Sequence, residues 1–182
     1  LKIKSKTKAD LSPWKKFVFN LKNPKNEVNI GLIGKYVELQ DSYKSILESF
    51  IHAGSVNSLK VNVHPIHSES INKKNIKSVM SNLHGVLVAP GFGERGIEGK
   101  IISIEFARLN DIPFLGICLG MQMAVIEYAR NVLGLKNANS SEMDNQTEDL
   151  VISLMDDQVK VEKKGGTMRL GSWNCEILNG TL

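Results

Sequence analysis

The amino-acid sequence predicts an α/β fold in which a mostly parallel central sheet has helices on both faces. Short apolar runs that suit buried strands alternate with longer stretches whose apolar residues recur at helical spacing. The strands are continuously apolar rather than alternating, which indicates burial on both faces, and repeated strand–helix–strand units produce parallel pairing. The length of 182 residues suits one compact domain of ordinary size.

The first 26 residues differ in composition from the rest. They hold eight lysines and one aspartate, a net charge of +7, so the remaining residues carry −3 of the overall +4. Asp10 or Ser12 as a cap and Pro13 in a first turn predict one short helix here. We therefore expect residues 1–26 to be a basic interdomain linker with a short helix, and residues 27–182 to be the folded domain. A lysine-only tail is typical of a solvated segment, so no nucleic-acid polymer is expected as a partner.

From residue 28 the pattern predicts four strands, each followed by a helix or a helical stretch. The expected strands are 28–33, 59–66, 85–89 and 113–117. The expected helices are 41–53, with Gly54 as a stop signal, then 72–83, 97–109 and 119–133. Later segments are less regular: a loop at 137–149, strands at 150–155 and 172–178, and a compact glycine-rich segment at 165–171. Right-handed crossovers would place ligands at the carboxyl ends of the strands.

Composition argues against several classes of protein. No apolar run approaches the roughly 18 residues of a membrane span, and the N-terminal residues lack the apolar region of a secretory signal. Two cysteines, Cys118 and Cys175, are too few for a disulfide framework or a structural zinc site. We expect a cytoplasmic protein with no metal and no membrane partner.

The strongest chemical signal is Gly116-Ile117-Cys118-Leu119-Gly120, where a predicted strand passes into a predicted helix. Glycines two residues before and after a nucleophile permit the sharp turn of a nucleophile elbow. A helix N-terminus favours the thiolate of Cys118, and the N–H of Leu119 points to where an oxyanion would form. An unreactive buried cysteine is the alternative, and it is the better interpretation of Cys175, which lacks such flanking residues.

A glycine-rich stretch, residues 90–96, follows the predicted strand 85–89 and so lies at the same sheet edge as Cys118. Its spacing matches neither G-x-G-x-x-G nor a phosphate-binding loop that ends in Gly-Lys-Ser/Thr. We expect the N–H of Gly91 to be a second oxyanion donor, with a plain glycine-rich turn as the alternative.

Other polar groups are less clearly marked. Gln122 lies one helical turn after Cys118, and Glu142 is a carboxylate suited to a substrate ammonium, but spacing alone favours a solvated role for each. A thiolate nucleophile needs a base, and all histidines precede Cys118. They are His52, His64, His67 and His84. Only the two on the second strand, 64 and 67, lie toward the expected active edge, and the sequence offers no clear base.

Residues 28–171 resemble the glutamine amidotransferase domain of the CTP synthase family. The matching segments are 34–39 (Gly-Lys-Tyr-Val-Glu-Leu), 91–100, 113–122, 124–134, 138–142 and 165–171 (Gly-Gly-Thr-Met-Arg-Leu-Gly). The elbow is typical of any class I glutamine amidotransferase, whereas the first and last of these segments are specific to CTP synthases. The resemblance implies a flavodoxin-like class I glutamine amidotransferase fold, truncated at the C-terminus.

The resemblance also implies an activity. Cys118 would hydrolyse glutamine through a glutamyl thioester and supply ammonia for the ATP-dependent amination of UTP to CTP in a separate synthetase domain of the same polypeptide. Gly91 and Leu119 would form the oxyanion hole. The glutamine-binding residues implied are Gly91, Phe92, Leu119, Gly120, Met121, Gln122 and Glu142.

Further roles follow from the same resemblance. Thr167 and Arg169 would lie in the segment that responds to GTP, an allosteric effector. Lys35, Tyr36 and Lys44 would lie near the junction with the synthetase domain. No cofactor is implied in this domain, whereas ATP and Mg would act in the synthetase domain, and the full-length enzyme would be a homotetramer.

Two departures from the family pattern stand out. Pro90 replaces a glycine, and because proline lacks an N–H, the donor role stays with Gly91. The resemblance places the catalytic His and Glu in a His-Pro-Glu motif beyond Leu182, and no histidine follows Cys118. We therefore expect this chain alone to be catalytically incomplete, with weak or absent glutaminase activity.

Two other functions compete with this one. The first is another class I amidotransferase or a cysteine hydrolase of similar fold, which the segment 165–171 argues against. The second is a non-catalytic regulatory module on the same fold, which the intact Cys118, Gln122 and Glu142 argue against.

Overall fold

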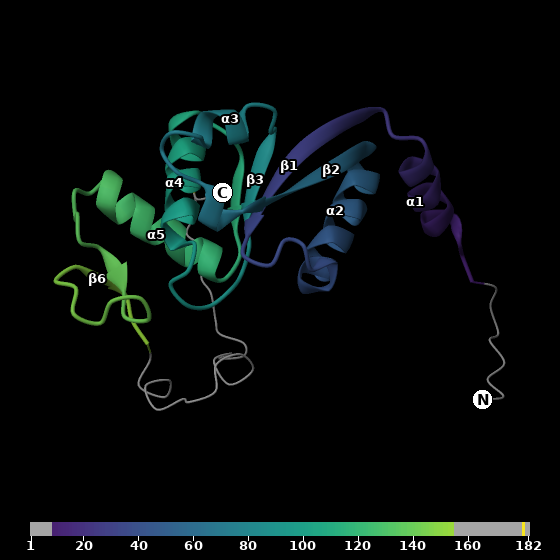
Figure 1. The fold of residues 1–182 in the computed structure, drawn as a ribbon. Helices are drawn as coiled ribbons and strands as arrows, with labels where there is room; N and C mark the ends of the chain where they lie inside the picture. Colours follow the sequence, from purple (N-terminus) through teal and green to yellow (C-terminus); the bar gives the residue numbers. More distant parts are fainter. Residues whose placement is uncertain (1–8, 155–179, 181–182) are drawn as a thin grey trace, which may run out of the picture.

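The computed structural model describes residues 9–154 and Gly180, and it contains a four-stranded sheet in the order β2-β1-β3-β4 (Figure 1). The strands are β1 Asn26–Gly34, β2 Leu59–His67, β3 Gly85–Val88 and β4 Phe114–Gly116. All three pairings are parallel. This is the flavodoxin-like order, in which the chain reverses direction across the sheet between β1 and β3. The predicted parallel α/β architecture is confirmed.

Helices cover both faces of the sheet. They are α2 Lys44–Asn57 on one face and α3 Ile76–Met80, α4 Ile97–Leu109 and α5 Leu119–Asn131 on the other (Figure 1). Neighbouring residues of β3 belong to different cores: Leu87 packs in the cluster with α2, and Val88 in the cluster with α4 and α5. Because side chains alternate along a strand, burial on both faces requires the continuous apolar runs seen in the sequence.

The N-terminal helix α1 Ser12–Lys22 packs against α2 rather than standing apart (Figure 1). The N-cap is Leu11, which makes no side-chain capping bond, so the prediction of Asp10 or Ser12 as the cap is wrong; the Asp10 carboxylate instead accepts a hydrogen bond from the Ser12 backbone N–H at 2.9 Å, just before the helix. Asn20 donates to the Ser55 carbonyl oxygen at 3.0 Å, and the Ser55 hydroxyl donates to the Phe17 carbonyl oxygen at 2.8 Å. The short helix expected within residues 1–26 is therefore present and is hydrogen-bonded to the domain.

Gly54 does not end the second helix, contrary to the sequence prediction. A single-turn helix, η1 Gln40–Tyr43, leads into α2, which continues past Gly54 to Asn57 and ends at Ser58, a residue with φ of 55°. A Cβ at residue 54 would lie 2.6 Å from the Leu59 carbonyl oxygen. The glycine is needed for the close approach of α2 to β2, and not for a turn.

The helix predicted at 72–83 is also shorter than expected. Only the five residues of α3 are helical, preceded by η2 Ser68–Ser70. Asn72 and Asn75 exchange side-chain hydrogen bonds with each other's backbone N–H groups, at 3.2 and 2.8 Å. Asparagine side chains that bond local backbone groups compete with the helix, and this delays its start.

Downstream of α5 the predicted loop at 137–149 contains a short strand. This strand, β5 Asn139–Ser140, pairs in parallel with β6 Leu150–Ile152, which lies within the predicted strand 150–155. The segments predicted at 165–171 and 172–178 lie outside the described residues. Within the described ranges no helix is both long enough and apolar enough to cross a membrane.

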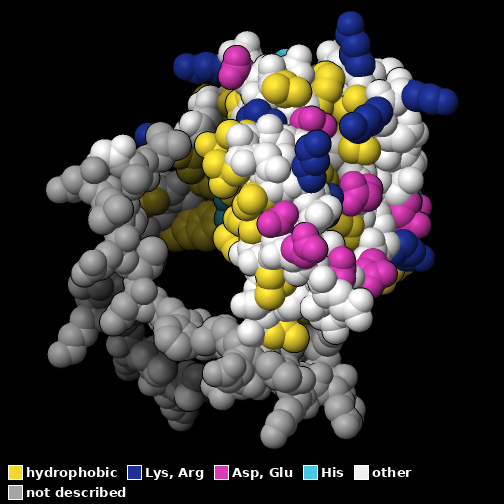
Figure 2. Space-filling view, turned by 90° about the vertical axis from the view of Figure 1, so that its left-hand side faces the viewer, with side chains coloured by type: hydrophobic (Ala, Val, Ile, Leu, Met, Phe, Trp, Pro, Cys, Tyr) yellow, Lys and Arg dark blue, Asp and Glu magenta, His cyan; other side chains and the backbone are white. Residues whose placement is uncertain are grey.

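One side of α5 remains apolar at the surface. Figure 2 shows hydrophobic side chains on the side of the molecule that carries α5 and β6. A shallow apolar groove there is lined by residues of α5, of the turn that follows α5, and of β6. The lining residues include Met121, Val125, Tyr128, Leu133 and Val151. Exposed apolar surface of this kind is typical of a region that contacts another segment or protein.

The turn from β4 into α5 is unusually tight. A Cβ at Gly116 would lie 2.6 Å from backbone atoms of Gly120 and Met121, and a Cβ at Gly120 would overlap the Val88 carbonyl oxygen. These two glycines let the first turn of α5 lie directly on the ends of β3 and β4. Both glycines of the predicted elbow are therefore required sterically, because a Cβ at either position would clash with neighbouring backbone atoms.

A buried ion pair joins α4 to α5. The Glu127 carboxylate is 1% exposed and accepts hydrogen bonds from Arg108 Nε and Nη2, the shortest at 2.7 Å, and from Asn131. The bond to Glu127 raises the pKa of Arg108. A carboxylate this buried is tolerable only because it is paired and hydrogen-bonded.

We expect Arg108→Ala to lower the free energy of unfolding of the domain by about 3 kcal/mol, because it leaves the buried Glu127 charge uncompensated. Equilibrium urea unfolding measures this. Arg95→Ala is the matched control, because the pair of Arg95 with Glu69 is exposed and should contribute less than about 1 kcal/mol. Equal losses in the two variants would contradict the argument.

We expect Gly120→Ala to destabilise the domain by about 3 kcal/mol or to prevent folding, because its Cβ has no space beside the Val88 carbonyl group. Gly91→Ala is the comparison: its φ is not positive, and its Cβ would make ordinary contacts at 3.6 and 3.9 Å. We expect Gly91→Ala to change the unfolding free energy by less than about 1 kcal/mol. The measurement is again urea unfolding, and a well-tolerated Gly120→Ala would be inconsistent with this packing.

Candidate active site

Cys118 lies between β4 and α5 in a strained backbone conformation. Its φ and ψ are 52° and −110°, and it is the N-cap residue of α5. A positive φ is rare for a residue with a side chain and is typical of functional sites. Its side chain is exposed to solvent. The predicted elbow geometry is therefore present, with the thiol at the carboxyl end of the sheet.

The first turn of α5 supplies a partial positive charge beside this thiol. The N–H groups of Met121 and Gln122 donate to the Cys118 carbonyl oxygen at 3.0 and 3.1 Å. Leu119 is the first residue of the helix, so its N–H has no acceptor within the helix. Free N–H groups and the helix dipole favour negative charge at this end. The donor role of Leu119 itself stays a prediction.

The loop of residues 89–93 (the oxyanion loop below) follows β3 and packs against α5. A Cβ at Gly91 would lie 3.6 Å from Leu119 Cδ2, so the two predicted oxyanion donors come from adjacent segments. Pro90 precedes Gly91, and the loop has no cis peptide bond. Residue 91 and the Leu119 side chain are therefore neighbours, and the oxyanion hole that their N–H groups would form stays a prediction.

Lys35 and Glu142 bind opposite sides of one peptide group in this loop. Lys35 Nζ donates to the Phe92 carbonyl oxygen at 2.7 Å and to the Gly93 carbonyl oxygen at 3.1 Å. The Gly93 N–H donates to Glu142 Oε1 at 3.2 Å. The C=O and N–H of a trans peptide point in opposite directions, so the lysine and the carboxylate together fix the plane of the Phe92–Gly93 peptide.

A second lysine lies beneath the same loop. Lys100 on α4 is 0% exposed, and its Nζ donates to the Ala89 carbonyl oxygen at 3.0 Å. Burial lowers the pKa of Lys100 to about 8; the Lys35 charge also lowers it, and Cys118 raises it. Burial is the main cause of a lowered pKa at Lys35 as well. The loop therefore rests on two buried ammonium groups.

The remaining predicted glutamine-binding residues surround the elbow. Phe92 and Met121 are 44% and 56% exposed. Gln122 is half-buried in the first turns of α5, and Gly120 is buried under the elbow. All seven of these predicted residues belong to the oxyanion loop, the elbow, the first turns of α5, or the β5–β6 connection that carries Glu142.

The residues predicted at an interdomain junction divide into two kinds. Tyr36 and Lys44 are exposed and accessible to another domain. Lys35 is only 7% exposed, and its ammonium is bound to the oxyanion loop. Thr167 and Arg169, predicted to respond to GTP, lie outside the described residues.

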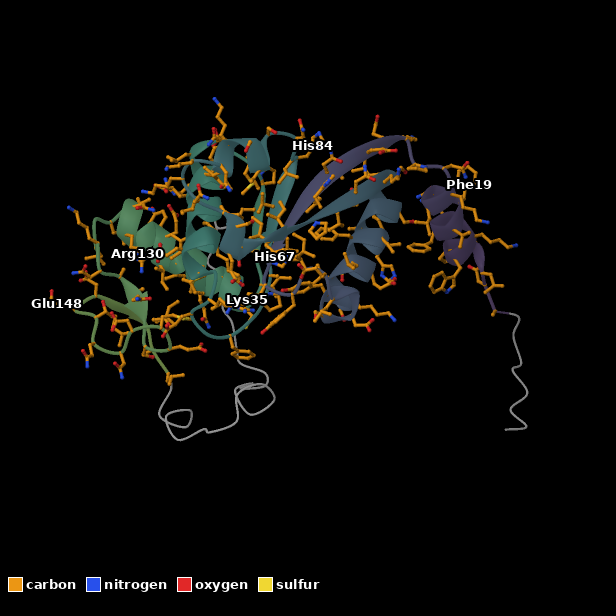
Figure 3. The ribbon with its side chains drawn as sticks, viewed as in Figure 1. Phe19, Lys35, His67, His84, Arg130 and Glu148 are labelled. Atoms are coloured by element: carbon orange, nitrogen blue, oxygen red, sulfur yellow. The ribbon has the colours of Figure 1, made fainter. Side chains whose placement is uncertain are left out.

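None of the histidines of the described ranges is placed to act as a base for Cys118. His64 and His67 are on β2, three strand spacings or roughly 14 Å across the sheet from β4. His67 pairs with Glu38, and Figure 3 shows it near the same end of the sheet as Lys35. His84 lies at the other end, where its Nδ1 accepts from the Asn29 N–H at 2.9 Å.

Sequence reasoning missed two roles at this site: it gave Lys35 only a place near an interdomain junction and gave Lys100 no role, whereas both bind the oxyanion loop. A signal for Lys100 was available: it lies on the apolar side of α4 with Ile97, Ile101 and Ile104, all buried. A lysine at a core position of a helix is rarely buried without a partner. Nothing local marked Lys35, whose acceptors are 57 and 58 residues away along the chain.

Comparison with known proteins agrees with this geometry. Residues 38–182 match the family described as glutamine amidotransferase class-I. The sequence is 67% identical over 168 residues to CTP synthase of Christiangramia forsetii, which covers 92% of this chain and 31% of the relative. It is 59% identical to CTP synthase of Flavobacterium johnsoniae over 100% of this chain and 34% of the relative. The chain spans about a third of the length of the curated relatives it matches.

A solved structure shares the fold. It is described as the Trypanosoma brucei CTPS glutaminase domain with bound acivicin, and it aligns with a TM-score of 0.68 at 36% identity over 73% of this chain and 52% of that one. The class I amidotransferase fold predicted from the sequence is thereby confirmed. With the family match over residues 38–182, the elbow at Cys118 and this shared fold, the chain belongs to the class I glutamine amidotransferase family and is similar to the glutaminase part of CTP synthases.

Proposed function

We propose that this chain is the glutaminase domain of a CTP synthase, with Cys118 as its nucleophile. The observation that carries the proposal is the exposed Cys118 thiol in a strained elbow at the start of α5, beside the oxyanion loop. The names of its relatives support CTP synthesis as the use of the ammonia.

The chemistry follows from the groups at the elbow. The Cys118 thiolate forms a bond to the side-chain carbonyl carbon of glutamine, and the C=O electron pair moves onto oxygen. The N–H groups of Gly91 and Leu119 stabilise that oxyanion. The C–N bond then breaks, nitrogen takes a proton and leaves as ammonia, and water cleaves the thioester to give glutamate. The proton would come from the histidine of the implied His-Pro-Glu motif.

Substrate recognition would come from the residues around the loop. The Glu142 carboxylate would bind the α-ammonium of glutamine, and Phe92, Gln122, Met121 and the backbone of Gly120 would enclose its side chain. Lys35 would hold the loop through the Phe92 and Gly93 carbonyl groups.

The remaining roles concern the whole polypeptide and rest on its relatives, which are about three times as long as this chain. We propose a synthetase domain in the same polypeptide that uses ATP and Mg to aminate UTP. GTP would be the allosteric effector through Thr167 and Arg169, and Tyr36 and Lys44 would face the junction. A cytoplasmic homotetramer completes the proposal.

We expect 6-diazo-5-oxo-L-norleucine, a reactive glutamine analogue, to form one adduct on Cys118 and none on Cys175. Intact mass and peptide mapping of the full-length protein measure this, with Cys118→Ala as the control. The same variant should lose glutamine-dependent CTP formation and keep ammonia-dependent CTP formation. Labelling without any CTP formation would favour another amidotransferase, and no labelling would favour a non-catalytic module.

We expect Glu142→Gln to raise the KM for glutamine about tenfold or more with a smaller effect on kcat, because it removes a charge-assisted hydrogen bond to the substrate ammonium. Steady-state glutaminase kinetics measure this. Glu148→Gln is the matched control, since Glu148 is exposed and points away from the domain (Figure 3). A KM that changes equally in both variants would argue against this role for Glu142.

A further inference from the structure

Lys100 is the fully buried cation that the proposed reaction leaves without a role. Its side chain is 0% exposed in the core of the α4 side of the sheet, among isoleucines. A buried ammonium has a large desolvation cost, and proteins accept that cost where the charge or its hydrogen bonds are used. The position of Lys100 directly below the oxyanion loop suggests what that use is.

The hydrogen bond of Lys100 acts on the peptide group that precedes Pro90, one residue before the Gly91 N–H. Lys100 Nζ binds the Ala89 carbonyl oxygen at 3.0 Å and so fixes the Ala89–Pro90 peptide plane. The ring of Pro90 locks its φ, which leaves only one backbone torsion between that plane and the Gly91 N–H. On the far side, Lys35 binds the Phe92 carbonyl oxygen at 2.7 Å. The Gly91 N–H therefore lies between two peptide groups that are each held by a lysine.

The charge of Lys100 lies close to Gly91 of the oxyanion loop. Its Nζ is 3.9 Å from where a Cβ of Gly91 would be. Burial lowers the pKa of Lys100, the Lys35 charge lowers it further, and Cys118 raises it, so that the pKa is about 8. These are the charged groups that act on Lys100, whereas Arg95, Glu69 and Glu142 act on its neighbour Lys35. Lys100 is thus mostly protonated at neutral pH.

We propose that Lys100 is a positioning residue of the glutaminase site: its buried ammonium orients the oxyanion loop through the Ala89 carbonyl group and adds positive charge beside Cys118. This inference rests on the proposed function, because it concerns the same thiol and the same oxyanion hole. It also makes a specific statement about pH. The neutral amine can still donate to Ala89, so deprotonation removes the charge and keeps the hydrogen bond.

The kinetic test compares Lys100→Met, a substitution of similar length without charge, with the unsubstituted full-length protein. We expect kcat for glutamine hydrolysis to fall about tenfold at pH 7, less than the loss of a direct oxyanion donor, with KM changed less than about twofold. The deficit should shrink as pH rises through about 8, because the unsubstituted protein then loses the Lys100 charge. Ser103→Ala is the control: it removes another fully buried polar group of α4, whose hydroxyl donates to the Gly99 carbonyl oxygen of the same helix, and it should change nothing.

A second readout needs no glutamine, and its pH dependence can first be measured on the unsubstituted protein. The rate of Cys118 alkylation by iodoacetate, divided by that for neutral iodoacetamide, reports positive charge beside the thiol, because thiol ionisation affects both reagents equally. In the unsubstituted protein this ratio should fall as pH rises through about 8. In Lys100→Met it should be lower at pH 7 and lack that step. Equilibrium urea unfolding checks that the variant domain is folded.

The outcomes separate the two proposals. If the unsubstituted protein hydrolyses no glutamine, the proposed function is wrong. If it does, and Lys100→Met matches it in kcat at all pH values, Lys100 has no positioning role. The inference is also overturned if the alkylation ratio of the unsubstituted protein shows no step near pH 8. It is overturned as well if Lys100→Met shows the same step, because Lys35 would then be the source of the step. If Lys100→Met does not fold, the absence of a step in the unsubstituted protein still overturns the inference.

Discussion

The contact between the start of α5 and the end of β3 is the constraint on which the site depends. Residue 120 has no side chain, so the backbone of the helix can lie against the Val88 carbonyl group. That approach forces the chain to turn within two residues, and Cys118 takes up the strain as a φ of 52°. Below it, the buried Leu119, Met123 and Ile126 anchor the helix in the core. The apolar core thus compensates for the strain that exposes the thiol.

Beside this turn, the oxyanion loop is held from below by charged groups. Three of its carbonyl oxygens, those of Ala89, Phe92 and Gly93, accept hydrogen bonds from buried lysines. Because the Phe92 and Gly93 carbonyl groups point toward Lys35, the N–H groups of the same two peptides point away from it, whereas the Ala89–Pro90 peptide has no N–H. Two ammonium groups close together in a low-dielectric environment also repel each other, and this is one reason for the lowered pKa of Lys100. The arrangement suits a site at which negative charge develops.

The sequence predicted most of the sheet and the elbow correctly for local reasons. A continuously apolar strand, and the number of residues between one such strand and the next, can be identified in short segments of sequence. The helix predicted at 97–109 has the same bounds in the structure. The wrong predictions fall at residues that make a contact which the local sequence pattern does not indicate. Gly54 was interpreted as a helix stop, but it serves a close contact with β2. The asparagines at 72 and 75 shortened the next helix through side-chain hydrogen bonds that a periodicity argument does not include.

The sequence by itself determined the succession of strands and helices along the chain, the cysteine at the strand-to-helix turn and the glycines beside it. Each of these depends on neighbours within a few residues. Only the tertiary structure decided which distant groups meet there. Lys35, the oxyanion loop, Lys100 and Glu142 come from four separate segments, and their hydrogen bonds span from 11 to 58 residues. It also placed the histidines of β2 across the sheet from Cys118. Such distances follow from strand order and helix packing, which no local pattern contains.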